Sequence, residues 1–310
     1  MNNNNLENLF YKDYSKLQYF KDNLFYEIEF NHKYYDNYIK LYEFTDFSFK
    51  QITSYNLCFF TKLLSINKAK FGDYFLINYE MKKHIQFLEY DSIIKIFTLS
   101  KKEIKTSKGG FFDKHFKDTI DCKNVNILTV DEEGLKLWEK RNKQKFYNKK
   151  YIFPKNYYKL YNIDDKTFIA KEYNLITFFK IEQIEPIKQC EFDGSIDFVS
   201  TINNKLLFLQ NKEKYILISL KFFDVIQIIE NSDKRYPLKI INNDLIQYSI
   251  KNNKIIIIKE VLNEKKGYFI KEKITELEVE SSLYPKILIT DNNNLFVGKK
   301  GSLSIFTEFI

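Results

Sequence analysis

The chain has 310 residues, a formal net charge of +8 and 17% aromatic side chains. A chain of this length can bury roughly three quarters of the surface that it exposes when unfolded, so it is long enough for a large core. No stretch approaches the ~18 uncharged apolar residues of a membrane span. The three widely spaced cysteines form no Cys-x-x-Cys pattern, which favours a reducing compartment, cytoplasmic or nuclear.

The sequence begins MNNNNLENLFYKDYSK, a polar segment of low complexity. Its first ten residues lack both the basic region and the apolar run of a signal peptide. We expect residues 1–20 to form a short polar arm, disordered in part. One domain is expected to follow over residues 21–310.

A strand–turn–strand pattern then recurs along the chain. It occupies residues 24–42, 84–97, 124–138, 166–179, 205–218, 244–258 and 294–306. The last large apolar residues of the second strands are Tyr42, Phe97, Trp138, Phe179, Ile218, Ile258 and Phe306. Four of the six separations between these markers are 39–41 residues. A period of about 40–45 residues with several strands per unit is typical of a β-propeller blade.

Helical solenoids have a similar period, but they need long 3.6-residue patterns and good helix formers. This chain has only two alanines, Ala69 and Ala170, and its apolar runs are mostly short. The sequence therefore predicts an all-β protein: a single closed β-propeller of seven four-stranded blades, with six or eight as alternatives. We expect the final segment GSLSIFTEFI to be a strand whose blade pairs with a strand from the N-terminal region, which would remove exposed sheet edges.

Residues 101–117 read KKEIKTSKGGFFDKHFK and predict a loop. Gly109 and Gly110 allow a sharp turn, and Phe111 and Phe112 could be exposed at its tip beside lysines. Exposed paired aromatics would suit a pocket on a partner protein. The alternative is that both rings pack under the next blade.

The hairpin at 124–138 is the most informative. NILTV is apolar and β-branched, LKLW alternates, and DEEG between them predicts a turn in which Gly134 can adopt a positive φ. A Trp-acid pair, Trp138-Glu139, ends this hairpin, which resembles the inner hairpin of a WD-repeat blade. The resemblance implies a buried, hydrogen-bonded structural set, whose equivalents here are His115, Thr129, Asp131 and Trp138. His115 lies at the short end of the family's spacing from the tryptophan.

Residues 140–163, KRNKQKFYNKKYIFPKNYYKLYNI, contain eight basic residues and no acidic one, while the rest of the chain carries 41 basic and 41 acidic side chains. Lysine and arginine could contact phosphates, and tyrosines could stack on unpaired bases of single-stranded RNA. The contact candidates are Lys140, Arg141, Lys143, Lys145, Lys149, Lys150, Tyr147, Tyr151, Tyr157 and Tyr158. A solvated outer strand and loop, an acidic protein or a membrane surface are alternatives. With only two arginines in the chain, base-edge readout is not expected.

No catalytic pattern accompanies these features. The three histidines stand in dissimilar contexts, and the chain contains no Gly-rich phosphate loop. We therefore expect no enzyme, cofactor, metal or small-molecule substrate. The sequence favours a scaffold that binds other protein subunits of an intracellular complex. The alternative is a ribonucleoprotein or ribosome-biogenesis component that contacts RNA through residues 140–159.

Overall fold

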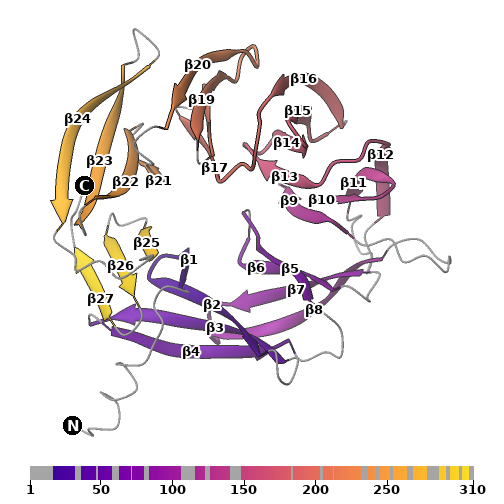
Figure 1. The fold of residues 1–310 in the computed structure, drawn as a ribbon. Helices are drawn as coiled ribbons and strands as arrows, with labels where there is room; N and C mark the ends of the chain where they lie inside the picture. The colour runs from indigo at the N-terminus through magenta and orange to yellow at the C-terminus, as the bar shows by residue number, and fades with distance from the viewer. Residues whose placement is uncertain are drawn as a thin grey trace, which may run out of the picture. The chain divides into compact units, whose positions relative to one another are not determined.

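The fold is given by a computed structural model (Figure 1). All regular elements among the described residues are β-strands, arranged in seven antiparallel sheets. The structure describes residues 17–31, 36–46, 48–57, 63–70, 72–79, 84–105, 116–122, 126–139, 148–182, 184–202, 205–211, 213–231, 236–241, 244–251, 254–263, 268–277, 286–290, 294–299 and 302–306.

The chain divides into two compact units. Unit 1 comprises Met1–Cys58, Lys212–Ile216 and Ile226–Ile310, and unit 2 comprises Phe59–Asn211 and Leu217–Val225.

Unit 1 contains the first and the last two sheets. The first is β1 (Gln18–Lys21), β2 (Leu24–Asn31), β3 (Asp36–Thr45) and β4 (Ser48–Asn56). The sixth is β21 (Tyr236–Ile241), β22 (Asp244–Lys251), β23 (Lys254–Asn263) and β24 (Tyr268–Leu277). The seventh is β25 (Lys286–Ile289), β26 (Leu295–Lys299) and β27 (Ser302–Phe306).

Unit 2 contains three complete sheets. The second sheet is β5 (Leu63–Lys68), β6 (Tyr74–Tyr79), β7 (His84–Asp91) and β8 (Ile96–Lys105). The third is β9 (Asp118–Cys122), β10 (Asn126–Asp131), β11 (Gly134–Glu139) and β12 (Asn148–Phe153). The fourth is β13 (Lys159–Asn162), β14 (Thr167–Glu172), β15 (Leu175–Lys180) and β16 (Glu185–Glu191).

The fifth sheet has residues in both units. It consists of β17 (Phe198–Ile202), β18 (Leu206–Gln210), β19 (Lys214–Ser219) and β20 (Val225–Glu230).

Every sheet is an up-and-down meander, and the next sheet begins only after the previous one is complete. First strands of successive sheets contact each other: β9 touches β5 and β13 in unit 2, and β21 touches β25 in unit 1. Consecutive meanders that meet through their first strands define a β-propeller, so the predicted fold class is confirmed. Six of the sheets have four strands, whereas the seventh has three among the described residues, not the four expected.

The sequence markers fall on the third strand of their sheets, with one error. Trp138 lies on β11 and Phe179 on β15, but Phe97 lies on β8, the fourth strand. The segment 84–97 is therefore the outer hairpin of its sheet, whereas the segments in the other four-stranded sheets are middle hairpins. At the start of the chain, β1 already includes residues 18–20 of the expected arm, and residues 1–16 lie outside the described part.

The middle strands of the third, fourth and fifth sheets are buried on both faces, which explains their nearly continuous apolar runs. In unit 2, side chains of β10 and β11 pack face to face with those of β14 and β15. Phe168 and Phe179 stack at 5.1 Å between ring centroids, and both are fully buried. Burial of a phenylalanine side chain contributes about 1.5–3 kcal/mol to stability. Phe179 also lies 5.4 Å from Phe153 of the third sheet, measured between ring centroids, so its burial helps to hold the two sheets together.

In unit 1, the last sheet packs against the first. Phe296 of β26 lies 5.1 Å from Phe25 of β2 and 4.9 Å from Phe44 of β3, measured between ring centroids. Figure 1 shows β26 and β2 side by side within this unit. Strands far apart in the sequence, β26 and the pair β2 and β3, thus pack against each other through aromatic side chains. The expected strand pairing between these ends is not seen among the described residues, where β27 pairs only with β26.

The β10–β11 hairpin forms as predicted, with a two-residue turn before Gly134. Gly134 has φ 124°, and a Cβ there would meet the carbonyl oxygen of Phe153. Within the hairpin, the Trp138 Nε1–H donates a 2.8 Å hydrogen bond to Thr129 Oγ1, and both side chains are buried. Asp131 instead accepts from the Glu133 backbone N–H at 2.8 Å and pairs with Lys136. His115 lies outside the described residues.

Trp138→Phe is expected to lower the free energy of unfolding by about 1–3 kcal/mol, because the Thr129 hydroxyl is left buried without its donor. Thr129→Val should lower the free energy of unfolding by a similar amount, because the Trp138 N–H is then buried without its acceptor. The double variant should lose less than the sum of the two single losses. Urea denaturation of the two single variants and the double variant measures this. Strictly additive losses would show that the hydrogen bond contributes nothing.

The thiol of Cys190 in β16 is half-buried, and burial raises its pKa to about 11, although Lys188 and Lys171 lower it in part. An unfolded thiol ionises at lower pH, so this group favours folding below its ordinary pKa, and that contribution is lost as the pH rises through 11. In a variant that retains only Cys190, Ellman's reagent at pH 8 should react about a hundredfold more slowly before unfolding than after it. Equal rates would contradict this.

Candidate functional site

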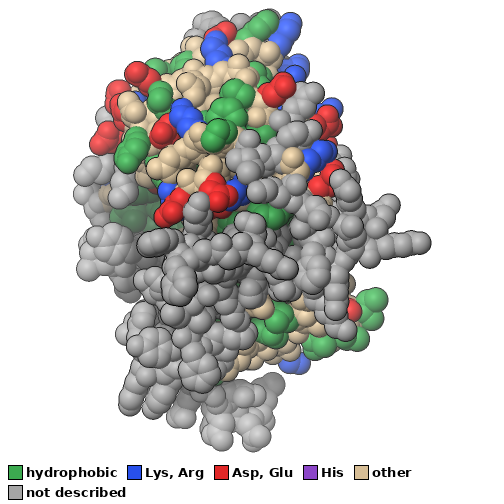
Figure 2. Space-filling model, turned by 90° about the vertical axis from the view of Figure 1, so that its right-hand side faces the viewer, with side chains coloured by type: hydrophobic (Ala, Val, Ile, Leu, Met, Phe, Trp, Pro, Cys, Tyr) green, Lys and Arg blue, Asp and Glu red, His purple; other side chains and the backbone are tan. Residues whose placement is uncertain are grey.

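The described surface in Figure 2 carries acidic and basic side chains interspersed with hydrophobic ones. Among the described residues, no group of three or more His, Cys, Asp and Glu side chains is arranged to hold a metal ion. In the same part of the chain, no helix has the length and hydropathy to cross a membrane.

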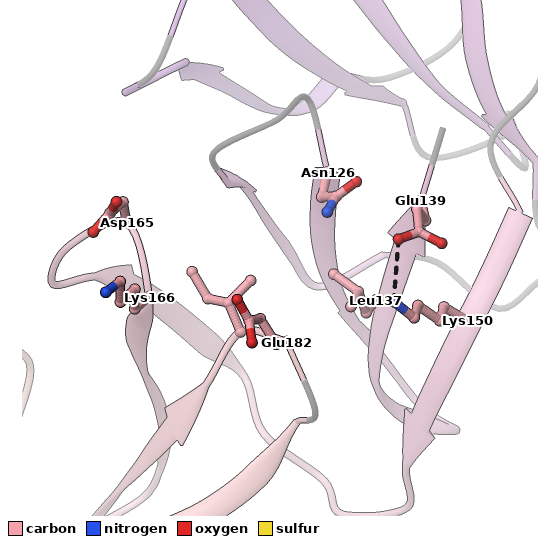
Figure 3. A pocket seen from close by; sticks show the side chains of 8 residues that line it. Asn126, Leu137, Glu139, Lys150, Asp165, Lys166 and Glu182 are labelled. Atoms are coloured by element: carbon pink, nitrogen blue, oxygen red, sulfur yellow. Dashed lines mark hydrogen bonds and ion pairs between the residues drawn. The ribbon is translucent and has the colours of Figure 1, made fainter. Parts of the chain in front are cut away.

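A groove of about 530 Å³ opens in unit 2 between the third and fourth sheets (Figure 3). On one side it is bounded by β10, β11 and β12, and on the other by the β13–β14 and β15–β16 turns. Its lining residues are Asn126, Leu137, Glu139, Lys150, Asp165, Lys166, Ile181 and Glu182.

The two turns on the fourth sheet are fixed by local hydrogen bonds. Asp164 Oδ1 accepts from the backbone N–H groups of Lys166 at 2.8 Å and Thr167 at 2.7 Å, which is how an aspartate stabilises a tight turn. The Lys166 carbonyl in turn accepts the Ile181 N–H at 2.8 Å, which joins the two turns. This wall of the groove is thus held in place by hydrogen bonds within the fourth sheet.

The groove has an apolar floor and a rim of mixed charge. Leu137 and Ile181 belong to the buried core between the two sheets. At the rim, Lys150 Nζ and Glu139 Oε1 form an ion pair of 3.1 Å, drawn as the dashed line in Figure 3. Lys166 and Glu182 are exposed, and no ion pair is recorded for either within the described residues. Such a rim can bind a polar or charged peptide segment.

A second polar cluster links the first strands of three sheets in unit 2. Asp118 Oδ2 of β9 accepts the Leu160 N–H at 2.8 Å, and Asp121 Oδ1 accepts the Lys70 N–H at 2.8 Å. Lys70 Nζ donates to the Ile163 carbonyl at 3.0 Å. The sequence analysis missed these carboxylates, although two aspartates in a five-residue strand are unusual enough to be a signal. Their bonds to neighbouring sheets indicate a structural role.

The described part of the basic segment, residues 148–163, does not form one surface. β12 begins beside the groove, where Lys150 pairs with Glu139, and the chain then runs to the opposite end of the sheets. There, Tyr158 lies 6.4 Å from Tyr173 of the β14–β15 turn, measured between ring centroids, and both rings are exposed. Lys150 and Tyr158 therefore cannot contact one short ligand together.

The position of Tyr157 contradicts the expectation that its ring is available for contact with RNA bases. It is fully buried in the core between the third and fourth sheets, and its hydroxyl donates to Thr177 Oγ1 at 3.2 Å. It therefore cannot offer a ring face to a base. Lys149 and Tyr151 lie on β12, opposite Trp138 and Leu137 of β11. The following predicted contacts lie outside the described residues: Phe111, Phe112, Lys140, Arg141, Lys143, Lys145 and Tyr147.

Comparison with known proteins supports the fold. No family model matches the chain, and no curated protein matches its sequence. A crystal structure of Sqt1 from Saccharomyces cerevisiae is similar with a TM-score of 0.57 and 10% identity, covering 96% of this chain and 97% of that one. A Lactobacillus plantarum protein is similar with a TM-score of 0.55 and 8% identity over 81% of both chains. At such identities the likeness shows the fold alone: the chain is a β-propeller.

Proposed function

We propose that this β-propeller is a non-catalytic scaffold that binds other protein subunits of an intracellular complex. The groove between the third and fourth sheets carries this proposal, because pre-formed turns surround an apolar floor with charged side chains at the rim. Exposed apolar side chains on ordered turns support it further: Ile93 is 89% exposed, and its N–H is held by Asp91 Oδ1 at 2.8 Å. Rigid apolar contacts of this kind are common in protein interfaces.

The WD-like character of one blade and the compartment belong to the same proposal. The Trp138–Thr129 hydrogen bond supports a WD-like blade at the third sheet. Cys122 and Cys190 are free thiols, which suits the reducing cytoplasm or nucleus.

The RNA alternative requires residues 140–159 to act together. The burial of Tyr157 and the position of Tyr158 beside Tyr173 reduce the number of rings available near Lys150. We therefore place protein binding first and keep RNA as an outcome of the test.

The test is affinity purification of the chain from its own cells, with the variant Lys166→Glu/Glu182→Lys beside the wild type. Both positions are exposed, so the fold should be unchanged, whereas a protein partner seated in the groove should be recovered at least about tenfold less. Lys205→Glu, an exposed change on the β17–β18 turn, is the control and should retain the partner. Partners that are equally recovered with both variants would overturn the assignment to the groove, and loss of all partners after ribonuclease treatment would favour RNA.

A further inference from the structure

Strand β20 is the outer strand of the fifth sheet and has an open edge. It pairs with β19, and no other described strand pairs with it. Its sequence is VIQIIE, and exposure alternates along it from Ile226 onward. Ile226 is 47% exposed and Ile228 is 56% exposed, whereas Gln227 and Ile229 are partly buried. Two β-branched side chains therefore stand on one solvent-facing side of an unpaired edge.

The other outer strands are protected against pairing with foreign strands. Lysines on edge strands prevent such pairing because adding a strand would place the charge against an apolar partner. In the four-stranded sheets, lysine occurs in each of β4, β8, β12, β16 and β24, and β16 also contains Pro186. β20 contains neither lysine nor proline. Its edge alone among these six lacks the usual protection.

The far end of β20 carries an exposed carboxylate, next to Glu213 and Lys214 at the start of β19. Glu230 is exposed and stands on the same side of the strand as Ile226 and Ile228, because side chains alternate with a period of two. Glu213 lies beside this end, since its carbonyl accepts the Asn231 N–H at 2.6 Å. A strand running antiparallel to β20 would place its first residue opposite Glu230, so a basic residue is favoured there.

We propose that β20 accepts an extended segment of a partner protein as a fifth, antiparallel strand. The main-chain edge supplies hydrogen bonds, and two apolar residues of the segment lie opposite Ile228 and Ile226. A lysine or arginine before them lies opposite Glu230. This inference rests on the proposed role as a scaffold, but it does not involve the groove.

The probe is a labelled peptide with the sequence lysine, threonine, isoleucine, threonine, isoleucine, threonine, titrated with the full chain and followed by fluorescence anisotropy. We expect Ile226→Lys/Ile228→Lys to weaken the binding of the peptide at least about tenfold, because each change places a charge on β20 opposite an isoleucine of the added strand. Glu230→Lys should reverse the charge preference, so that a peptide beginning with glutamate binds better than the original. A peptide N-methylated at alternate residues on its pairing edge should bind at least about tenfold more weakly, since it cannot form the ladder.

The matched control is Ile250→Lys. Ile250 is 41% exposed, but it lies on β22, which is paired on both edges by β21 and β23, so peptide binding should be unchanged. Melting temperatures equal to the wild type show that the variants are folded. The inference would be overturned by undiminished binding to Ile226→Lys/Ile228→Lys, by equal binding of the N-methylated peptide, or by self-association of the chain that the same variant abolishes. If the peptide fails to bind while the groove variant still loses its partner, β20 is excluded and the scaffold role stands.

Discussion

Phe296→Ala is expected to lower the free energy of unfolding by about 3–5 kcal/mol, the range for truncating a buried phenylalanine. The ring is 3% exposed and contacts Phe25, Phe44 and Phe49 of the first sheet. The substitution leaves a cavity where the last sheet of unit 1 meets the first. Urea denaturation followed by circular dichroism measures the change.

Phe222→Ala provides the matched control, because that ring is 61% exposed on the β19–β20 turn. Its loss should change stability by no more than about 0.5 kcal/mol. If the Phe296 variant were as stable as this control, the packing between the first and last sheets would contribute little, and the fold would depend on the hydrogen-bond ladders alone.

The fold was predictable because its signals are local. Turn sequences such as DEEG and the apolar middle strands mark each middle hairpin, and repetition at a near-constant interval implies one unit per sheet. The same reasoning failed at Phe97. A four-stranded meander contains three consecutive hairpins of similar composition, and periodicity alone does not distinguish the middle from the outer one. Burial separates them, since outer strands such as β16 and β20 are largely exposed.

The candidate site was less predictable, because it depends on which sheets are neighbours. Lys150 was singled out for its charge, yet its place at the groove follows from the ion pair with Glu139 and from turns of the next sheet. Tyr157 and Tyr158 are adjacent in sequence and equal in chemistry, but one is fully buried and the other is 41% exposed. Composition cannot separate such a pair. Both residues precede β13, and the path of the backbone there decides which ring faces the core.

The open edge of β20 illustrates a signal that sequence alone could carry once strands are assigned. The absence of lysine in VIQIIE becomes informative only beside the lysines of the other outer strands, and those strands must first be recognised as outer. Apolar composition by itself would suggest a buried middle strand instead. The sheet topology shows that this apolar run is an outer strand, and this makes it a candidate contact surface.

Asp131→Ala is expected to lower the free energy of unfolding by about 3 kcal/mol, because it removes the buried partner of the Lys136 ammonium group. Asp131 is fully buried, and the Lys136 side chain that it pairs with is 5% exposed. The loss should fall at the lower end of the range for buried pairs, since Glu133 still lies 2.6 Å from Lys136 Nζ. Chemical denaturation at neutral pH gives the value.

Glu133→Ala is the control for this charge cluster. Its carboxylate is 35% exposed, so its removal should cost no more than about 1 kcal/mol. Combining Asp131→Ala with Lys136→Met should recover part of the stability lost in the single aspartate variant, because no unpaired cation then remains in the hairpin. The order of stabilities follows from burial, with the fully buried carboxylate contributing more than the solvated one. Equal losses for Asp131→Ala and Glu133→Ala would show that water reaches Lys136 freely, and the hairpin would then owe its stability to the Trp138–Thr129 bond and to apolar packing.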